Sequence, residues 1–175
     1  MRLQDERLDM ANFYTADTSA WSMFGTFGIR TPIYHAFRAF NELAKRPRRV
    51  ACTLAGRTPA AGDAAKPRSA AENEINPGGD TAKRPTMPSV AVAGIAEDGA
   101  SAVVLVSTFD AVAGSRTITV AGLPWAAAAR VEPLLVDDDY ALEPVAVNKA
   151  ASGPAATFTV DLPADATFLL RLTKP

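Results

Sequence analysis

The chain has 175 residues, enough for one domain with a hydrophobic core, and its 18 basic and 19 acidic side chains leave a net charge of −1. This balance argues against nucleic acid or an anionic membrane surface as a partner. No apolar run approaches the roughly 20 residues of a membrane-spanning helix, and residues 1–7 lack the apolar core of a signal peptide. One cysteine excludes an internal disulfide and leaves the compartment open. One histidine argues against zinc, so we expect neither a metal nor a cofactor.

The first 30 residues predict one short strand, at residues 10–15, followed by an aromatic loop at 16–30. The loop carries aromatic side chains and turn glycines, namely Trp21, Phe24, Gly25, Phe27 and Gly28. Glycine permits the backbone conformations that tight turns require, so we expect the chain to reverse direction here.

Residues 31–45 predict the one amphipathic helix of the chain. Thr31 is expected to cap its first turn with its side chain, and Pro32 suits that turn because proline lacks an N–H that would have no helical partner. The basic pair at 45–46 complements the negative end of the helix dipole, and Pro47 ends the helix.

One apolar stripe runs along this helix at helical spacing, formed by Ile33, Phe37, Phe40 and Ala44. The plainest interpretation is a helix that packs on a core and carries no chemistry. His35 lies beside the stripe, and we expect a partly buried, hydrogen-bonded side chain rather than a ligand or a catalytic base.

Residues 49–54 predict a strand in which Cys52 is an inert buried thiol. Residues 55–88 are rich in proline, glycine and alanine and hold too little apolar surface to offset the entropy of ordering. This composition predicts a flexible loop, either an insertion or a boundary. We therefore divide the chain into an N-terminal arm and helix at 1–48 and a second domain at 49–175.

From residue 89 onward, short segments alternate between apolar and polar residues or run apolar between turn residues. The expected strands are 90–96, 102–109, 117–120, 129–136, 156–162 and 168–173. The segment 102–109 is almost continuously apolar, so we expect cover on both its faces. Pro133 predicts an edge strand or a bulge. Such strands are typical of an antiparallel β-sandwich.

The stretch from Phe24 to Leu43 resembles the end of the catalytic barrel in glycoside hydrolase family 39, the β-xylosidase-like group. In that family a Phe-Gly loop leads through Lys-Pro-x-Tyr-x-Ala-Phe into the last barrel helix; here residues 30–31, Arg-Thr, stand where the family has a lysine before the proline. Three further segments are similar to parts of these proteins: the eighth barrel strand and its loop (10–17), the first sandwich hairpin (90–99 with 103–106) and an acidic segment before the last strands (136–140).

The resemblance implies a mainly β fold, an antiparallel β-sandwich preceded by one amphipathic helix that is the remnant of a (β/α)8 barrel end. Family 39 enzymes are retaining glycosidases, which need two carboxylates about 5 Å apart. These sit on the fourth and seventh barrel strands, which have no counterpart here, and the acid/base follows an asparagine in Asn-Glu-Pro. The two Glu-Pro pairs of this chain, at Glu132 and Glu143, follow valine and leucine. We therefore expect no catalytic residue, and a non-catalytic accessory portion that is inactive on its own.

Candidate sugar contacts are aromatic or acidic residues placed where barrel enzymes carry substrate loops, or on the sandwich surface. They are Asp17, Trp21, Phe24 and Trp125. Simple packing is the alternative for each. Residues 137–139, Asp-Asp-Asp, lack the spacing of an EF-hand calcium loop, so a solvated turn is expected.

Two other functions stay open at this stage. The first is an autonomous carbohydrate-binding sandwich that uses Trp21 or Trp125 as a platform for xylan-type sugars. The second is an interaction module in which Ile33, Phe37 and Phe40 mediate homo-oligomerisation or meet a partner chain.

Overall fold

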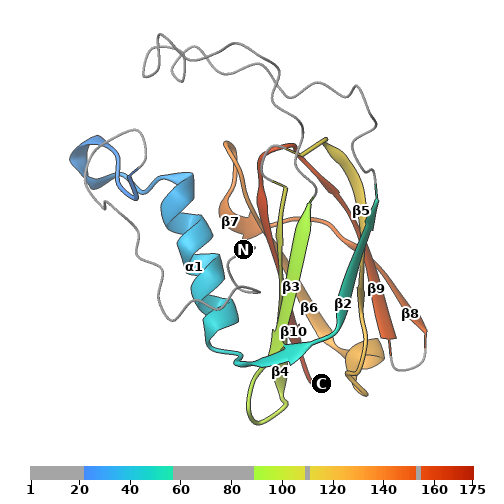
Figure 1. The fold of residues 1–175 in the computed structure, drawn as a ribbon. Helices are drawn as coiled ribbons and strands as arrows, with labels where there is room; N and C mark the ends of the chain where they lie inside the picture. The colour runs from blue at the N-terminus through green and yellow to red at the C-terminus, as the bar shows by residue number, and fades with distance from the viewer. Residues whose placement is uncertain (1–21, 57–88, 109–110, 153–154) are drawn as a thin grey trace.

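The structure is a computed structural model, and it describes residues 22–56, 89–108, 111–152 and 155–175. The predicted strand at 10–15 and residues 57–88 of the loop predicted at 55–88 lie outside these residues, whereas residues 55–56 are the end of a strand rather than loop. Two antiparallel sheets stack face to face, with orders β1-β3-β4-β10-β6-β7 and β2-β5-β9-β8 (Figure 1). The strands are β1 (Arg48–Val50), β2 (Cys52–Gly56), β3 (Val90–Ile95), β4 (Ser101–Ser107), β5 (Gly114–Val120), β6 (Arg130–Val136), β7 (Ala141–Pro144), β8 (Asn148–Ser152), β9 (Ala155–Leu162) and β10 (Thr167–Thr173).

One helix, α1 (Pro32–Ala44), forms a third layer on the outer face of the six-stranded sheet (Figure 1). It contacts β4, β6, β7 and β10. Its bounds lie within one residue of the predicted helix. None of the helices in the described segments has the length and apolar character to span a bilayer. The predicted fold class, a β-sandwich preceded by one helix, is confirmed.

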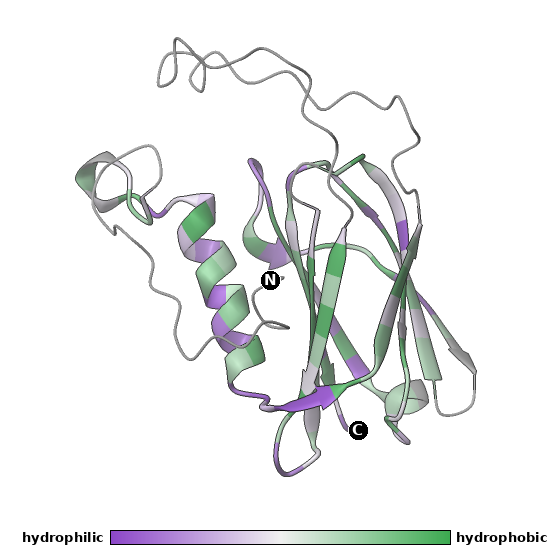
Figure 2. Ribbon diagram, in the orientation of Figure 1, coloured by the Kyte–Doolittle hydropathy of each residue, from purple (hydrophilic) through white to green (hydrophobic). Residues whose placement is uncertain are grey.

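Strand β4 is buried on both faces, as its continuous apolar sequence predicts. Val104 and Val106 point into the main core between the two sheets, whereas Val103 and Leu105 belong to a second core beneath α1. Successive side chains of a strand face opposite sides, so an apolar residue at every position requires cover above and below. Figure 2 shows the contrast with α1, where hydrophobic and hydrophilic residues alternate along the helix.

The last strand, β10, follows the same rule. Phe168, Leu170 and Leu172 are fully buried in the main core, as the alternation predicts. Leu169 is also fully buried, because it faces α1 rather than solvent. Arg171 shares that outer face and lies close to the end of the helix, where it forms ion pairs.

The single strand predicted at 49–54 is two strands that belong to different sheets. β1 pairs with β3 in the six-stranded sheet, and β2 pairs with β5 in the four-stranded sheet. Ala51 lies between them, and its carbonyl accepts a hydrogen bond from Ala121 N–H at 3.0 Å. The chain therefore turns a corner of the sandwich at this point. Cys52 is half-buried against the main core, in keeping with a packed thiol.

Pro133 does not mark an edge strand, because β6 lies between β10 and β7. The register shift of the β6–β7 pair falls between Leu135 and Val136, beyond the proline. The carbonyl of Pro133 accepts a hydrogen bond from Val145 N–H at 3.1 Å. The backbone nitrogen of Pro133 therefore points in the same direction, toward β7. It lies just past the last residue of the β7 ladder, Pro144. The missing N–H therefore forgoes only a bond to Val145, beyond the end of β7, and leaves the β6–β10 ladder intact.

Gly94 on β3 is required by the close approach of the segment that follows α1. A Cβ at Gly94 would clash with the backbone oxygen of Arg46 and lie 3.3 Å from Leu43 Cδ1. We expect Gly94→Ala to lower the free energy of unfolding by about 1–3 kcal/mol, because backbone cannot yield as a flexible side chain can. Urea unfolding measures this. Gly25→Ala, whose added methyl would meet only ordinary contacts from 3.6 Å outward, is the control. Equal stability of the two variants would contradict the prediction.

Candidate functional site

A tight turn precedes α1 and carries the two most exposed large apolar side chains of the described residues, Phe27 at 96% and Ile29 at 67% exposed. Gly25 N–H donates to the carbonyl of Ile29 at 2.6 Å, and Phe24 pairs with Arg30 as an isolated antiparallel bridge. Phe27 has φ 62°, a left-handed conformation that is strained for a bulky residue. The turn therefore displays apolar side chains at a conformational cost, which is a feature of contact surfaces.

Thr31 occupies the N-cap position of α1, but it does not cap the helix with its side chain as predicted. Its hydroxyl instead points back to the turn, 2.8 Å from the carbonyl oxygen of Ser22 and 3.1 Å from that of Met23. Its backbone N–H also donates to Met23 O at 3.1 Å. The side chain that was expected to complete the helix therefore ties the turn to it.

The two faces of α1 differ in what they contact. His35, Ala39 and Leu43, each one turn apart, are buried against the six-stranded sheet. At 3.6 residues per turn, Phe37 points about 160° away from Ala39, and its side chain is 40% exposed. The predicted apolar stripe is therefore not the face that packs on the sandwich, although Phe40 at its margin does pack beside the outer core.

His35 is 8% exposed and lies on the docked face of α1. Its Nδ1 lies 3.4 Å from Arg38 Nη1, and its ring meets that of Tyr34 edge-on at 5.3 Å. Burial lowers the pKa of His35 below its ordinary value of 6.5, and the charges of Arg38 and Arg30 lower it further, against an opposing effect of Glu143. The expectation of a buried, hydrogen-bonded histidine is confirmed.

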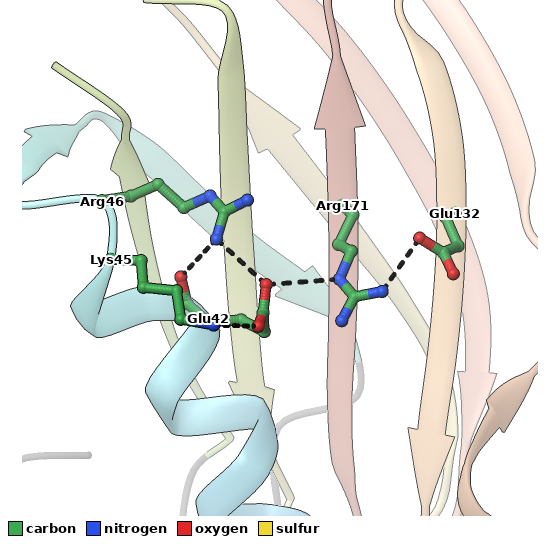
Figure 3. A network of polar contacts seen from close by, with 5 residues as sticks. All are labelled: Glu42, Lys45, Arg46, Glu132 and Arg171. Carbon is green, nitrogen blue, oxygen red and sulfur yellow. Dashed lines mark hydrogen bonds and ion pairs between the residues drawn. The ribbon is translucent and has the colours of Figure 1, made fainter. Parts of the chain in front are cut away.

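An ionic network fixes the end of α1 to the sheet (Figure 3). Glu42 receives Lys45 Nζ at 2.9 Å and Arg46 Nη1 at 3.1 Å, and Arg171 Nε of β10 lies 3.6 Å away. Arg171 in turn contacts Glu132 of β6 at 3.1 Å. The basic pair at 45–46 was predicted to complement the helix dipole. It also pairs with Glu42, whose carboxylate lies close to Arg171 of the sheet as well.

The structure does not bring the predicted sugar contacts together. Phe24 lies in the turn before α1, where its ring packs 5.4 Å from that of Tyr34. Trp125 precedes a short 3-10 helix, η3 (Ala126–Ala128), and is partly buried against the main core. The turn and η3 lie at opposite corners of the molecule in Figure 1. Asp17 and Trp21 lie outside the described residues.

The glutamates of the two Glu-Pro pairs, Glu132 and Glu143, are not opposite each other in the sheet. Glu143 pairs with Leu135, three residues along β6 from Glu132, which places the two glutamates roughly 10 Å apart, against about 5 Å for a retaining pair. Residues 22–56, 89–108, 111–152 and 155–175 contain no group of three or more potential metal-ligating side chains. Asp137 forms the predicted turn, its Oδ1 accepting from the N–H groups of Asp139 and Tyr140 at 2.8 Å.

The residues that sequence reasoning missed are those that hold α1 in place. Glu42 carried a signal, because it precedes Lys45 and Arg46 by three and four residues, the spacing of ion pairs on a helix. Arg171 carried a weaker one, as the one charged side chain within an otherwise apolar strand. No signal in the sequence indicated that these two groups meet.

No protein-family model matches the sequence, and no curated protein matches it. Among solved structures, the chain is similar to a glucosidase from Croceicoccus marinus, with a TM-score of 0.59 and 16% identity over 91% of this chain. The match spans 35% of that glucosidase, about a third of its length. CelM2, a bifunctional glucanase-xylanase from a metagenome library, gives a TM-score of 0.38 and 17% identity, covering 55% of this chain and 20% of its own. At these identities the glucosidase likeness shows a shared fold alone, and the CelM2 likeness carries no argument.

Glu42→Gln removes the charge that joins α1 to β10 and keeps the side-chain size. We expect the free energy of unfolding at neutral pH to fall by about 1 kcal/mol, because the carboxylate is largely buried while several of its partners are screened by solvent. Urea unfolding measures the loss, and Glu97→Gln in the exposed β3–β4 turn is the control.

The same variant has a defined pH dependence. Burial alone would raise the pKa of Glu42, but the hydrogen bond from Lys45 and the charge of Arg171 outweigh it and hold the pKa below 4.5. The stabilisation is therefore fully present above about pH 4.5 and is lost as the pH falls through the lowered pKa. Native chain and Glu42→Gln should converge in stability under acid conditions; a constant difference would contradict this.

Proposed function

We propose that this chain is the non-catalytic accessory portion of a glycoside hydrolase of the family 39, β-xylosidase-like type, in which the sandwich and the closing helix of the barrel form one packed unit. The residues from Phe24 to Leu43 carry the family resemblance, and the fold is shared with about a third of a glucosidase. The register of β6 and β7 separates Glu132 and Glu143 by three residues along the sheet, which supports an accessory role.

The observation that carries this proposal is the double-faced helix. One face of α1 is buried on the six-stranded sheet, and the opposite side presents the apolar Phe37, with Phe27 and Ile29 on the adjoining turn. A helix that serves only its own sandwich needs one apolar face. A helix between a sandwich and a second body needs two.

The proposal predicts that the purified chain does not hydrolyse aryl β-xylosides above the rate of a buffer control. A positive control enzyme establishes the sensitivity of the assay. Turnover that disappears in Glu132→Gln or Glu143→Gln would overturn the accessory role, because it would locate a catalytic carboxylate within the sandwich.

We also propose that the stripe of Ile33, Phe37 and Phe40, with Phe40 at the margin of the docked face, contacts a second protein body, either another copy or a partner chain that supplies the catalytic barrel. Phe37 is 40% exposed on this side of α1, and Phe27 and Ile29 are exposed on the preceding turn. Further burial of these side chains by a second body would stabilise a complex.

Sedimentation of the isolated chain tests this surface. We expect concentration-dependent association that weakens in Phe37→Ser. Tyr140→Ser in the β6–β7 turn is a matched control, because Tyr140 is 39% exposed and Phe37 is 40% exposed. A chain that stays monomeric at all concentrations, or an equal effect of both variants, would argue against self-association and leave a barrel-bearing partner, tested by co-expression with and without the substitution.

A carbohydrate-binding sandwich is the second candidate, and the partly buried Trp125 is the observation in its favour, since part of its indole stays accessible. Titration with xylo-oligosaccharides, followed by tryptophan fluorescence and by calorimetry, distinguishes a carbohydrate-binding sandwich from the accessory portion proposed above. Binding that is lost in Trp125→Ala would favour this candidate, and the absence of any signal would rule it out.

A further inference from the structure

His35 is the only histidine of the chain, and it is buried at the junction between α1 and the six-stranded sheet. Arg38 Nη1 lies 3.4 Å from His35 Nδ1. Because arginine can only donate hydrogen bonds, Nδ1 accepts from it only when the ring is neutral and carries its proton on Nε2. Protonation of Nδ1 would place two donors against each other beside a ring that is 8% exposed.

The charges around the ring oppose a third positive charge. Arg38 lies on the same helix and Arg30 on the turn before it, and both disfavour the protonated ring; Glu143 on β7 is the carboxylate that favours it. The other charged groups at this interface, Arg171 on β10 and Glu132 on β6, already pair with each other and with the end of α1. Two cations against one carboxylate leave the docked face unfavourable to an imidazolium.

The docking of α1 is also separable from the rest of the fold. Its buried contacts belong to the outer core, with Ala39 and Leu43 against Val103, Leu105 and Leu169. The main core between the sheets contains no residue of α1. Loss of the helix contacts would therefore leave the two-sheet packing in place.

We propose that α1 is an acid-sensitive element: protonation of His35 weakens the docking of the helix on the six-stranded sheet while the sandwich stays folded. Each transient opening of α1 exposes the apolar outer face of β4 and β10 and changes the surface available to a second body. This inference stands on the interface alone and does not depend on a glycosidase-type role.

The direction and range of the effect follow from linkage. Burial and the two arginines hold the pKa of His35 below 6.5, so the docked state binds fewer protons than the released state. Docking is therefore fully favoured above about pH 6.5 and weakens as the pH falls from there through the lowered pKa. Glu42 acts in the same sense only below its own ordinary pKa of 4.5, so the two groups are separated on the pH axis.

Amide hydrogen exchange tests the proposal, expressed as protection factors, which remove the intrinsic pH dependence of exchange. We expect protection of α1 amides to fall by up to about tenfold between about pH 7.5 and 5.5, since one pH unit below the free pKa changes the protonation balance by about tenfold. Amides of β5 and β9 should keep their protection and serve as the internal control. Unchanged protection of α1 would overturn the proposal.

Substitutions identify the responsible group. His35→Phe and His35→Gln cannot protonate, so α1 in either should keep its protection at pH 5.5; a fall equal to that of the native chain in whichever variant folds would overturn the proposal. The single imidazole resonance of the native chain reports the titration directly. Arg38→Gln should raise the pKa of His35 and Glu143→Gln should lower it, a pair of opposite shifts that a merely structural role would not produce.

Discussion

The architecture depends on the six-stranded sheet being apolar on both faces. Val103, Leu105 and Leu169 point away from the sandwich core and are fully buried only because α1 lies over them. Leaving these side chains in water would cost several kcal/mol, at about 1.5–3 kcal/mol for each. A two-sheet sandwich normally solvates its outer faces. Here the outer face needs a helix, so helix and sandwich form one structural unit even though they are separate in sequence.

Sequence patterns correctly predicted which side chains are buried where a single strand periodicity decides the face on which they lie. The continuous apolar run of β4 predicted cover on both faces, and Phe168, Leu170 and Leu172 lie on the predicted side of β10. The patterns did not predict strands that form only because they pair with a neighbouring strand. Neither β7 nor β8 was predicted, because their exposed alanine, proline and polar residues give no alternation, and pairing with β6 and β9 makes them strands.

The face of α1 illustrates the limit most clearly. The apolar moment of the helix comes from its phenylalanines, so the pattern selects the stripe with Phe37. The sheet instead accepts the smaller Ala39, which lets the helix lie close to β4, and the charged Glu42, which meets Arg171. Helix–sheet fit is decided by volume and by long-range charge pairs, and neither is visible in a helical period. Phe24, one of the predicted sugar contacts, packs against the ring of Tyr34, and its sugar-contact role stays a prediction.

The corner at Ala51 bears on the order in which the strands pair during folding. Immediately after α1, the chain places β1 in one sheet and β2 in the other, and both pair with strands far along the sequence. Closing such long loops costs entropy before any contact compensates for it, so local hairpins such as β3–β4 can form early while this segment joins late. Because α1 packs only on the outer face, its docking need not precede the pairing of the two sheets. A chain in which the sheets have paired but α1 has not docked would present a sandwich with one apolar face still open.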